Sequence, residues 1–82
     1  MLILWDEPKR HANLDKHGLD FAVLTIAFFE TSLVVTAKDG RFKALGRLAD
    51  GSIAVIFATL GTEALSVISM RPASDKERKL LP

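Results

Sequence analysis

Apolar and polar residues are spaced along the chain in two ways, helix-like before about residue 32 and strand-like after it. The apolar run at residues 2–5 predicts a short strand, and the segment from Glu7 to about His17 predicts a helix. Pro8 suits the first turn of that helix, because its missing N–H would have no partner there. Gly18 follows the helix and is a common stop signal, because it readily adopts left-handed backbone angles.

A second helix is predicted from Phe21 to about Glu30, and Asp20 is a candidate N-cap for it. One face of this helix would carry Phe21, Leu24, Thr25 and Phe28. The β-branched residues of the segment would also suit a strand. Its length of about ten residues, without an internal turn signal, favours the helix.

From Leu33 onward the pattern predicts four consecutive strands. Their ranges are Leu33–Lys38, Arg41–Leu48, Ser52–Thr59 and Ala64–Met70. Asp39-Gly40 and Asp50-Gly51 favour tight hairpin turns, so an antiparallel meander is expected. Ser74 and Glu77 have the spacing of a helix capping box, and a short helix is expected over residues 76–81.

The predicted fold class is α+β, in the order β-α-α-β-β-β-β-α, with an antiparallel sheet, two N-terminal helices and a short C-terminal helix. At 82 residues the chain is expected to form one domain, residues 1–82, because each half would approach the limit of about 40 residues below which disulfides or metals are usually needed. Hydrophobic residues make up 49% of the chain and charged residues 26%, which is typical of a globular protein rather than a disordered one.

The composition excludes several classes of protein. The chain has no cysteine, which excludes disulfides, thiolate zinc sites and cysteine nucleophiles. The N-terminus lacks the basic region of a signal peptide, and Glu30 interrupts the most apolar stretch, residues 21–37. We therefore expect a cytoplasmic protein without a membrane segment. Glycine-rich phosphate loops and the GxSxG motif are missing, so nothing indicates a nucleotide hydrolase or an esterase.

Basic residues are concentrated in the second half of the chain. Residues 1–37 hold three basic and five acidic side chains, whereas residues 38–82 hold eight basic and five acidic ones. Strand alternation places Arg41, Lys43, Leu45 and Arg47 on one face. Three cations without a carboxylate on this face indicate a surface for phosphate oxygens. The alternative is the solvated outer face of a sheet.

Arg71 ends the last predicted strand. Alternation places it on the same face as Ser69, Leu65 and Val67, from which it is expected to reach the same site. The alternative is that Arg71 caps the strand end or pairs with Asp75 of the next helix.

Lys16 and His17 resemble a catalytic basic pair. Helix C-termini also favour these residues for electrostatic reasons alone, so a structural role is the alternative. His11 and His17 are not three or four residues apart, the spacing that a shared metal would need on one helix face. No metal site is predicted.

Residues from both halves of the chain also form an ordered set. The set is Trp5-Asp6, Lys9, Asn13, Lys16-His17-Gly18, Phe21, Arg41, Leu45-Gly46, Gly51, Thr59, Ile68-Ser69-Met70-Arg71-Pro72-Ala73-Ser74 and Glu77-Arg78. In this order the residues resemble the BrnT toxins. The pattern WD…K…N..KHG..F followed by IS-x-RPAS-x-KER is fairly specific, and it covers nearly the whole chain.

The resemblance implies a RelE-like fold and a metal-independent endoribonuclease that arrests translation and needs no cofactor. It also implies a BrnA-like antitoxin that blocks the toxin, with operator DNA bound only together with that antitoxin. We expect Arg41, Arg71 and Lys43 to be the catalytic residues, because cations stabilise the charge that develops on a phosphate. Arg47, Lys16 and His17 are expected to bind RNA.

The chain departs from the family pattern at its end and at two earlier positions. BrnT-like sequences usually carry arginine where this chain has Ser66 and often where it has Gly61, and their late tyrosine is absent here. An alternative function follows, namely a weak or inactive relative that binds the antitoxin and represses transcription with it. Direct DNA reading by a helix-turn-helix is not predicted, because the second helix has no basic residue.

Overall fold

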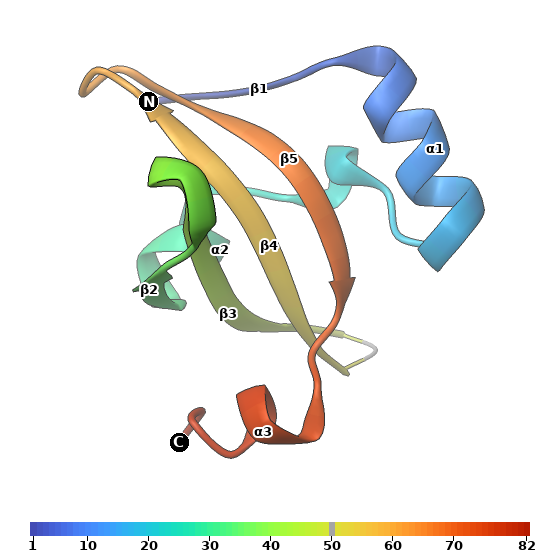
Figure 1. Ribbon diagram of the computed structural model, residues 1–82, viewed down its shortest axis with the longest axis vertical. Helices are drawn as coiled ribbons and strands as arrows, with labels where there is room; N and C mark the ends of the chain where they lie inside the picture. The colour runs from blue at the N-terminus through green and yellow to red at the C-terminus, as the bar shows by residue number, and fades with distance from the viewer. Residues whose placement is uncertain (50) are drawn as a thin grey trace.

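Five strands form one sheet in the spatial order β1-β5-β4-β3-β2, in a computed structural model that describes residues 1–49 and 51–82 (Figure 1). The strands are β1 (Leu2–Trp5), β2 (Leu33–Thr36), β3 (Phe42–Leu48), β4 (Gly51–Leu60) and β5 (Ala64–Pro72). Strands β2 to β5 pair antiparallel in sequence order, as the turn dipeptides predict. Asp50 of the predicted Asp50-Gly51 turn lies outside the described residues.

Strand β1 makes the sheet mixed. It pairs parallel to β5, with Leu2 opposite Ala64 and Trp5 opposite Val67, so the expectation of a purely antiparallel sheet is wrong. Short connections fix the direction of β2 to β5. The long stretch of chain between β1 and β5 imposes no such direction, because a long connection permits parallel pairing.

The turn between β2 and β3 has the geometry that Asp39-Gly40 predicts. Asp39 and Gly40 both have left-handed backbone angles, with φ of 60° and 73°. The N–H of Arg41 donates to the carbonyl of Lys38 at 3.2 Å and closes the turn. Such hairpin turns need positive φ at both central residues, which Asp tolerates and Gly adopts without strain. The turn holds Lys38 and Arg41 close together between β2 and β3.

Helix α1 (Glu7–His17) has the predicted bounds and ends at Gly18, whose N–H donates to the carbonyl of Leu14 at 2.8 Å. The helix packs beside β5. There the buried Asn13 side chain accepts a hydrogen bond from the N–H of Met70 at 3.0 Å. Because β1 pairs with only the first part of β5, Asn13 satisfies a backbone donor that no strand reaches.

The single helix predicted from Phe21 to Glu30 is wrong. The segment forms one 3₁₀ turn at Phe21–Val23, then extended residues, then helix α2 (Ile26–Thr31). The Thr25 hydroxyl accepts a hydrogen bond from the N–H of Phe28 at 3.1 Å, which starts a new helix inside the predicted one. A β-branched residue with a hydroxyl group favours such a cap over a helix interior.

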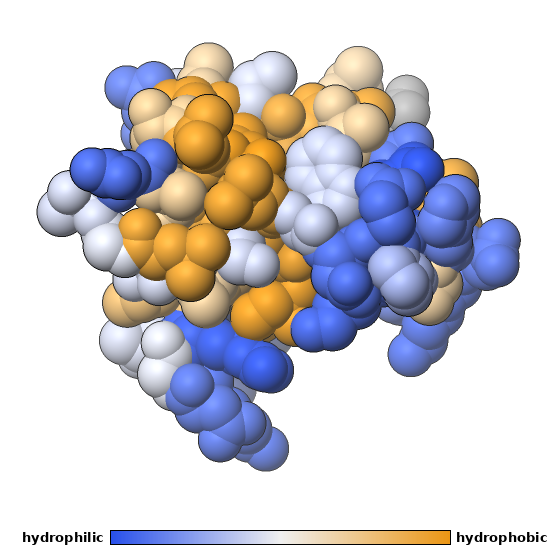
Figure 2. Space-filling view, turned by 90° about the horizontal axis from the view of Figure 1, so that it is seen from above, coloured by the Kyte–Doolittle hydropathy of each residue, from blue (hydrophilic) through white to orange (hydrophobic). Residues whose placement is uncertain are grey.

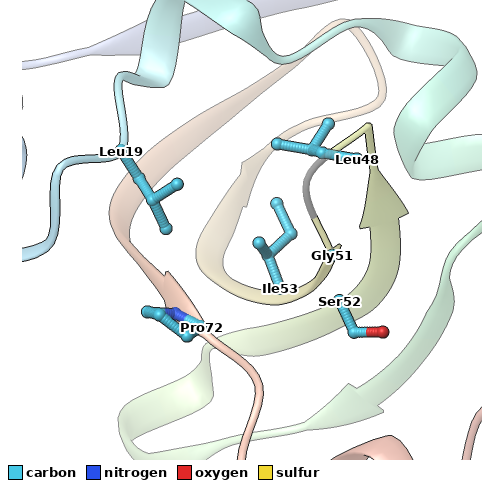
Figure 3. Close-up of a pocket in the computed structure, with 6 residues that line it drawn as sticks. All are labelled: Leu19, Leu48, Gly51, Ser52, Ile53 and Pro72. Carbon is cyan, nitrogen blue, oxygen red and sulfur yellow. The ribbon is translucent and has the colours of Figure 1, made fainter.

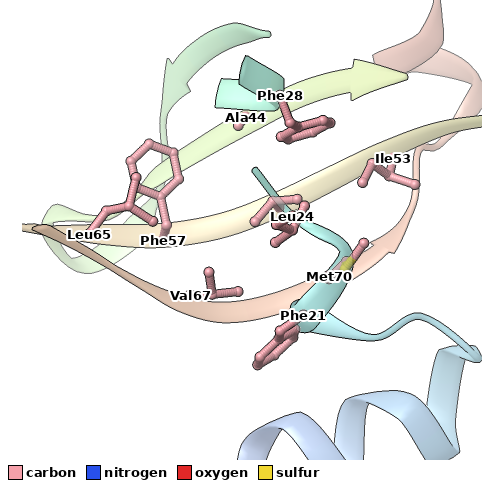
Figure 4. Packing of buried hydrophobic residues seen from close by; sticks show 10 residues of the cluster. Phe21, Leu24, Phe28, Ala44, Ile53, Phe57, Leu65, Val67 and Met70 are labelled. Carbon is pink, nitrogen blue, oxygen red and sulfur yellow. The ribbon is translucent and has the colours of Figure 1, made fainter. Parts of the chain in front are cut away.

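The side chains expected on the buried face of that helix still reach the core. Phe21, Leu24 and Phe28 are buried, whereas Thr25 is exposed. They cover one face of the sheet, where they meet Ala44, Ile53, Val55, Phe57, Leu65, Val67 and Met70 (Figure 4). Trp5 packs at the core edge, with its ring centroid 6.4 Å from that of Phe21.

A bulge in β5 decides which of its residues face the core. Two consecutive residues of β4 pair with residues of β5 that are two apart, so Ile68 is an extra residue in β5. Leu65 and Val67 therefore lie in the core, whereas Arg71 faces the opposite side of the sheet. The expectation that these two residues share a face with Arg71 is wrong for this reason.

Helix α3 (Asp75–Arg78) is shorter than expected, but its predicted capping box is present. The Ser74 hydroxyl accepts from the N–H of Glu77 at 3.1 Å, and the Glu77 carboxylate accepts from the N–H of Ser74 at 2.9 Å. Figure 1 shows α3 at the end of the sheet away from the β4–β5 turn. No helix within the described residues has the length and apolar character needed to cross a membrane.

Gly46→Ala tests the close approach of α2 to β3. A Cβ atom at Gly46 would lie 2.6 Å from Cε1 and 2.9 Å from Cζ of the buried Phe28 ring. Because the packed ring has little room to move, we expect the free energy of unfolding to fall by about 1–3 kcal/mol, measured by urea denaturation. In a Phe28→Leu background, Gly46→Ala should lower the free energy of unfolding by a smaller amount. Equal costs in both backgrounds would contradict this contact as the cause.

Candidate nucleic-acid interface

The sheet face opposite the core carries the predicted cations of β3. Lys43 and Arg47 lie on this face on either side of Leu45, which is fully buried. The Lys43 side chain is only 26% exposed, so this part of the face is not simply a solvated surface. The alternative of a solvated outer face therefore does not describe Lys43.

A pocket brings four cations together on this side of the sheet. Its lining residues are Ala37, Lys38, Arg41, Lys43, Ile56 and Arg71, and its volume is about 350 Å³. The cations come from three places, the β2–β3 turn, strand β3 and the end of β5. Arg41, Lys43 and Arg71, the residues predicted to be catalytic, thus line one pocket.

Glu77 of α3 joins two of these cations. Its carboxylate accepts hydrogen bonds from Nη1 and Nη2 of Arg71 at 2.7 and 2.9 Å. Its Oε2 atom also accepts from Nζ of Lys43 at 2.8 Å. With the capping bond from Ser74, four N–H donors converge on one carboxylate, and the Glu77 side chain is only 10% exposed. Glu77 therefore ties α3 to both β3 and β5.

The same contacts fix the charges of the cluster. The Arg71 guanidinium, and to a smaller extent Lys43 and the N–H of Ser74, hold the pKa of the Glu77 carboxyl well below its ordinary value of 4.5, although burial opposes this shift. The hydrogen bond from Glu77 in turn raises the pKa of Arg71. Glu77 is therefore an anion and Arg71 a cation at neutral pH.

The other predicted site residues lie elsewhere. Arg47 donates to the main-chain carbonyl of Pro82 at 2.7 Å and does not line the pocket. Lys16 and His17 end helix α1, which packs beside β5, and they do not line the pocket either. Their predicted role in RNA binding stays a prediction.

The alternative partner expected for Arg71 is wrong. Asp75 pairs with Arg78 within α3, whereas Arg71 pairs with Glu77. Asp75 lies at the exposed start of the helix, and the Glu77 side chain is turned toward the sheet, so only Glu77 reaches Arg71.

Sequence reasoning missed Glu77 and Lys38 as members of the site. The sequence indicates Glu77 as a residue of the capping box and of the ordered family motif, but nothing in its neighbourhood indicates a contact with Lys43, 34 positions away. The sequence pattern places Lys38 at the end of a strand. The Asp39-Gly40 turn is a usable signal, because a tight hairpin brings Lys38 close to Arg41.

A second hollow has different chemistry. It is lined by Leu19, Leu48, Gly51, Ser52, Ile53 and Pro72 (Figure 3). Leu19, Leu48 and Ile53 point toward one another, and no lining residue is charged. Within residues 1–49 and 51–82, no three histidine or carboxylate side chains come together as metal ligands. The four-cation pocket is therefore the candidate for binding an anionic substrate.

The depressed pKa of Glu77 predicts how stability depends on pH. Its stabilising contribution is complete above about pH 4.5, the ordinary pKa, and is lost as the pH falls toward the lower folded-state value. We expect Glu77→Gln to lower the free energy of unfolding by about 2 kcal/mol at pH 7 and by less at about pH 3, where part of the contribution is already lost. Urea denaturation across this pH range, with Glu63→Gln as an exposed control, measures the effect. An equal loss at both pH values would contradict it.

Comparisons with known proteins found a similar family model and a similar solved structure. A sequence model described as "Ribonuclease toxin, BrnT, of type II toxin-antitoxin system" matches residues 5–77. The crystal structure of the Brucella abortus ribonuclease toxin BrnT is similar, with 54% sequence identity and a TM-score of 0.85. The match covers 92% of this chain and 99% of that one. A comparison with curated proteins found no match.

Both matches span most of the chain, and the family model includes every residue that lines the four-cation pocket. They confirm the resemblance that the ordered motifs indicate. The chain therefore belongs to the BrnT family of ribonuclease toxins, the endoribonucleases of type II toxin-antitoxin systems.

Proposed function

We propose that this protein is a metal-independent endoribonuclease that cleaves RNA and inhibits translation until a BrnA-like antitoxin neutralises it. The observation that carries the proposal is the pocket lined by Lys38, Arg41, Lys43 and Arg71 in a chain of the BrnT family. Operator DNA would be bound only together with the antitoxin.

Cations can support RNA cleavage at the phosphate itself. In the proposed reaction the 2′-oxygen of the ribose attacks the adjacent phosphorus and loses its proton. The bond from phosphorus to the 5′-oxygen then breaks, and that oxygen gains a proton. The products are a 2′,3′-cyclic phosphate and a 5′-hydroxyl. Negative charge grows on the phosphate oxygens before the bond breaks, so fixed cations lower the barrier.

Arg41 and Arg71 are assigned to the scissile phosphate. Arg41 forms no side-chain hydrogen bond or ion pair with another described residue, so its guanidinium is available for a bidentate contact with phosphate. Lys43 adds a third charge from the middle of the face. Arg47 extends the cationic face along β3 and would guide the RNA strand, and Lys16 and His17 remain candidates for contacts farther along the RNA.

Arg41→Ala tests the assignment of the phosphate contact. We expect cleavage of a single-stranded RNA to slow by about 10²–10³-fold, as for removal of one donor from an oxyanion-binding site. The rate is measured with purified protein in the presence of EDTA, which also tests metal independence. Lys76→Ala is the control, because Lys76 is exposed on α3 and does not line the pocket. Undiminished cleavage by Arg41→Ala would refute the assignment.

The inactive relative remains the alternative function. Ser66 pairs with Ala58 along the upper part of β5, and Gly61 lies in the β4–β5 turn. Neither residue lines the four-cation pocket. Arginines at these two positions would therefore extend the cationic surface outside the pocket, and the pocket does not need them. This favours an active enzyme over an inactive relative.

An exposed apolar surface supports a protein partner. Figure 2 looks onto the end of the molecule that carries the N-terminus and the β4–β5 turn, and hydrophobic side chains gather there. Met1, Leu2 and Leu60 are 65%, 63% and 49% exposed. A groove beside them is lined by Met1, Ile26, Phe29, Glu30, Phe57, Thr59 and Leu65. Such a surface is typical of interaction sites.

Induced expression of the chain, alone and with its candidate antitoxin, tests the toxin function. We expect growth arrest and cleaved cellular RNA for the chain alone, and normal growth when the antitoxin is present. Cells that express the Arg41→Ala variant should grow normally with or without the antitoxin. Normal growth and intact RNA despite folded wild-type protein that still binds the antitoxin would favour the inactive relative.

A further inference from the structure

We infer that Glu77 is a positioning residue of the proposed nuclease, which holds Arg71 and Lys43 in the arrangement that binds the scissile phosphate. This inference rests on the proposed function. Glu77 contacts both cations, yet it is not among the residues that line the pocket. It therefore holds the two cations without occupying the space that a phosphate would take.

The hydrogen bonds of Arg71 leave a binding edge available. A guanidinium has five N–H groups. Two of those in Arg71 donate to Glu77, and a third donates from Nη1 to the carbonyl of Pro72 at 3.3 Å. The Nε–H and the second Nη2–H have no acceptor among the described residues. These two groups form the parallel pair that can hold two phosphate oxygens, and the side chain is 35% exposed.

Lys43 is held in the same way. One of its three N–H donors reaches Glu77, and its side chain still lines the pocket at 26% exposure. Long cationic side chains lose much rotational freedom when they bind a ligand in a fixed place. A carboxylate that fixes two of them beforehand removes part of that cost from the reaction.

The geometry argues against two other roles for Glu77. A general base must take a proton, but four donors already surround this carboxylate and keep its pKa low. A side chain that blocked the pocket would have to move out of it when RNA binds. Glu77 is instead buried and fixed by the capping bond to Ser74, and it does not line the pocket.

The positioning role predicts opposite effects on binding and on cleavage. Removing the carboxylate adds net positive charge beside the pocket, so RNA should bind at least as tightly. The freed cations would lose their fixed geometry, and small misplacements in an active site cost about 10- to 100-fold in rate. A merely structural role would change the amount of folded protein and leave both quantities unchanged for the folded fraction.

Glu77→Gln is the test variant, because glutamine also satisfies the capping box and should keep α3 formed. Binding is measured with a 2′-O-methyl RNA, which lacks the attacking hydroxyl. Cleavage is measured in single turnovers of the matching RNA at saturating protein, with the folded fraction checked by circular dichroism. We expect binding as tight as wild type or tighter, and cleavage slower by at least about tenfold.

Asp75→Asn is the matched control, because it removes an ion pair from the same helix without touching Arg71 or Lys43. It should bind and cleave like wild type. If Glu77→Gln fails to fold, Glu77→Asp gives the same test, since it keeps the charge but shortens the reach to Arg71, and its cleavage should slow with unchanged binding.

An active wild type whose Glu77 variant cleaves as fast or faster would overturn the positioning role alone. Equal losses in the Glu77 and Asp75 variants would also overturn it. A wild-type protein that cleaves no RNA would instead overturn the proposed function, and the positioning role with it.

Discussion

Four N–H donors converge on the carboxylate of Glu77, and the arrangement of the four-cation pocket depends on this contact. A buried anion of this kind is tolerated only when its partners satisfy it, and here two cations and a backbone amide do so. The contact serves two purposes at once. It docks the four-residue helix α3 onto the sheet, and it holds Arg71 and Lys43 beside the pocket. A helix this short would have little stability without such an anchor.

Two irregularities of the sheet bring the cations of the pocket together. The extra residue Ile68 in β5 changes the alternation, so Val67 and Met70 both pack in the core while Arg71 faces the other side. The left-handed turn at Asp39-Gly40 returns the chain so that Arg41 faces the same pocket. Bulges and tight turns often redirect side chains at functional sites, and this sheet uses both for one site.

The two faces of the sheet have different roles. On one face, Phe21, Leu24 and Phe28 form the core with the sheet, and Phe28 packs so closely that β3 needs a glycine opposite it. The other face carries the cations and α3. Glu77 offsets the repulsion among the cations on this face. The hydrophobic core on the opposite face can therefore pack closely without accommodating these charges.

The sequence alone determined the features that depend on neighbouring residues. Alternation along β3, the Asp39-Gly40 turn, the stop at Gly18 and the capping box at Ser74 act over a few residues, and the structure agrees with each of these predictions. The family also followed from ordered motifs. Only the tertiary structure decided the parallel pairing of β1, the break before α2, the bulge at Ile68 and the partners of Glu77. These depend on contacts between distant segments, where packing and burial outweigh local preference.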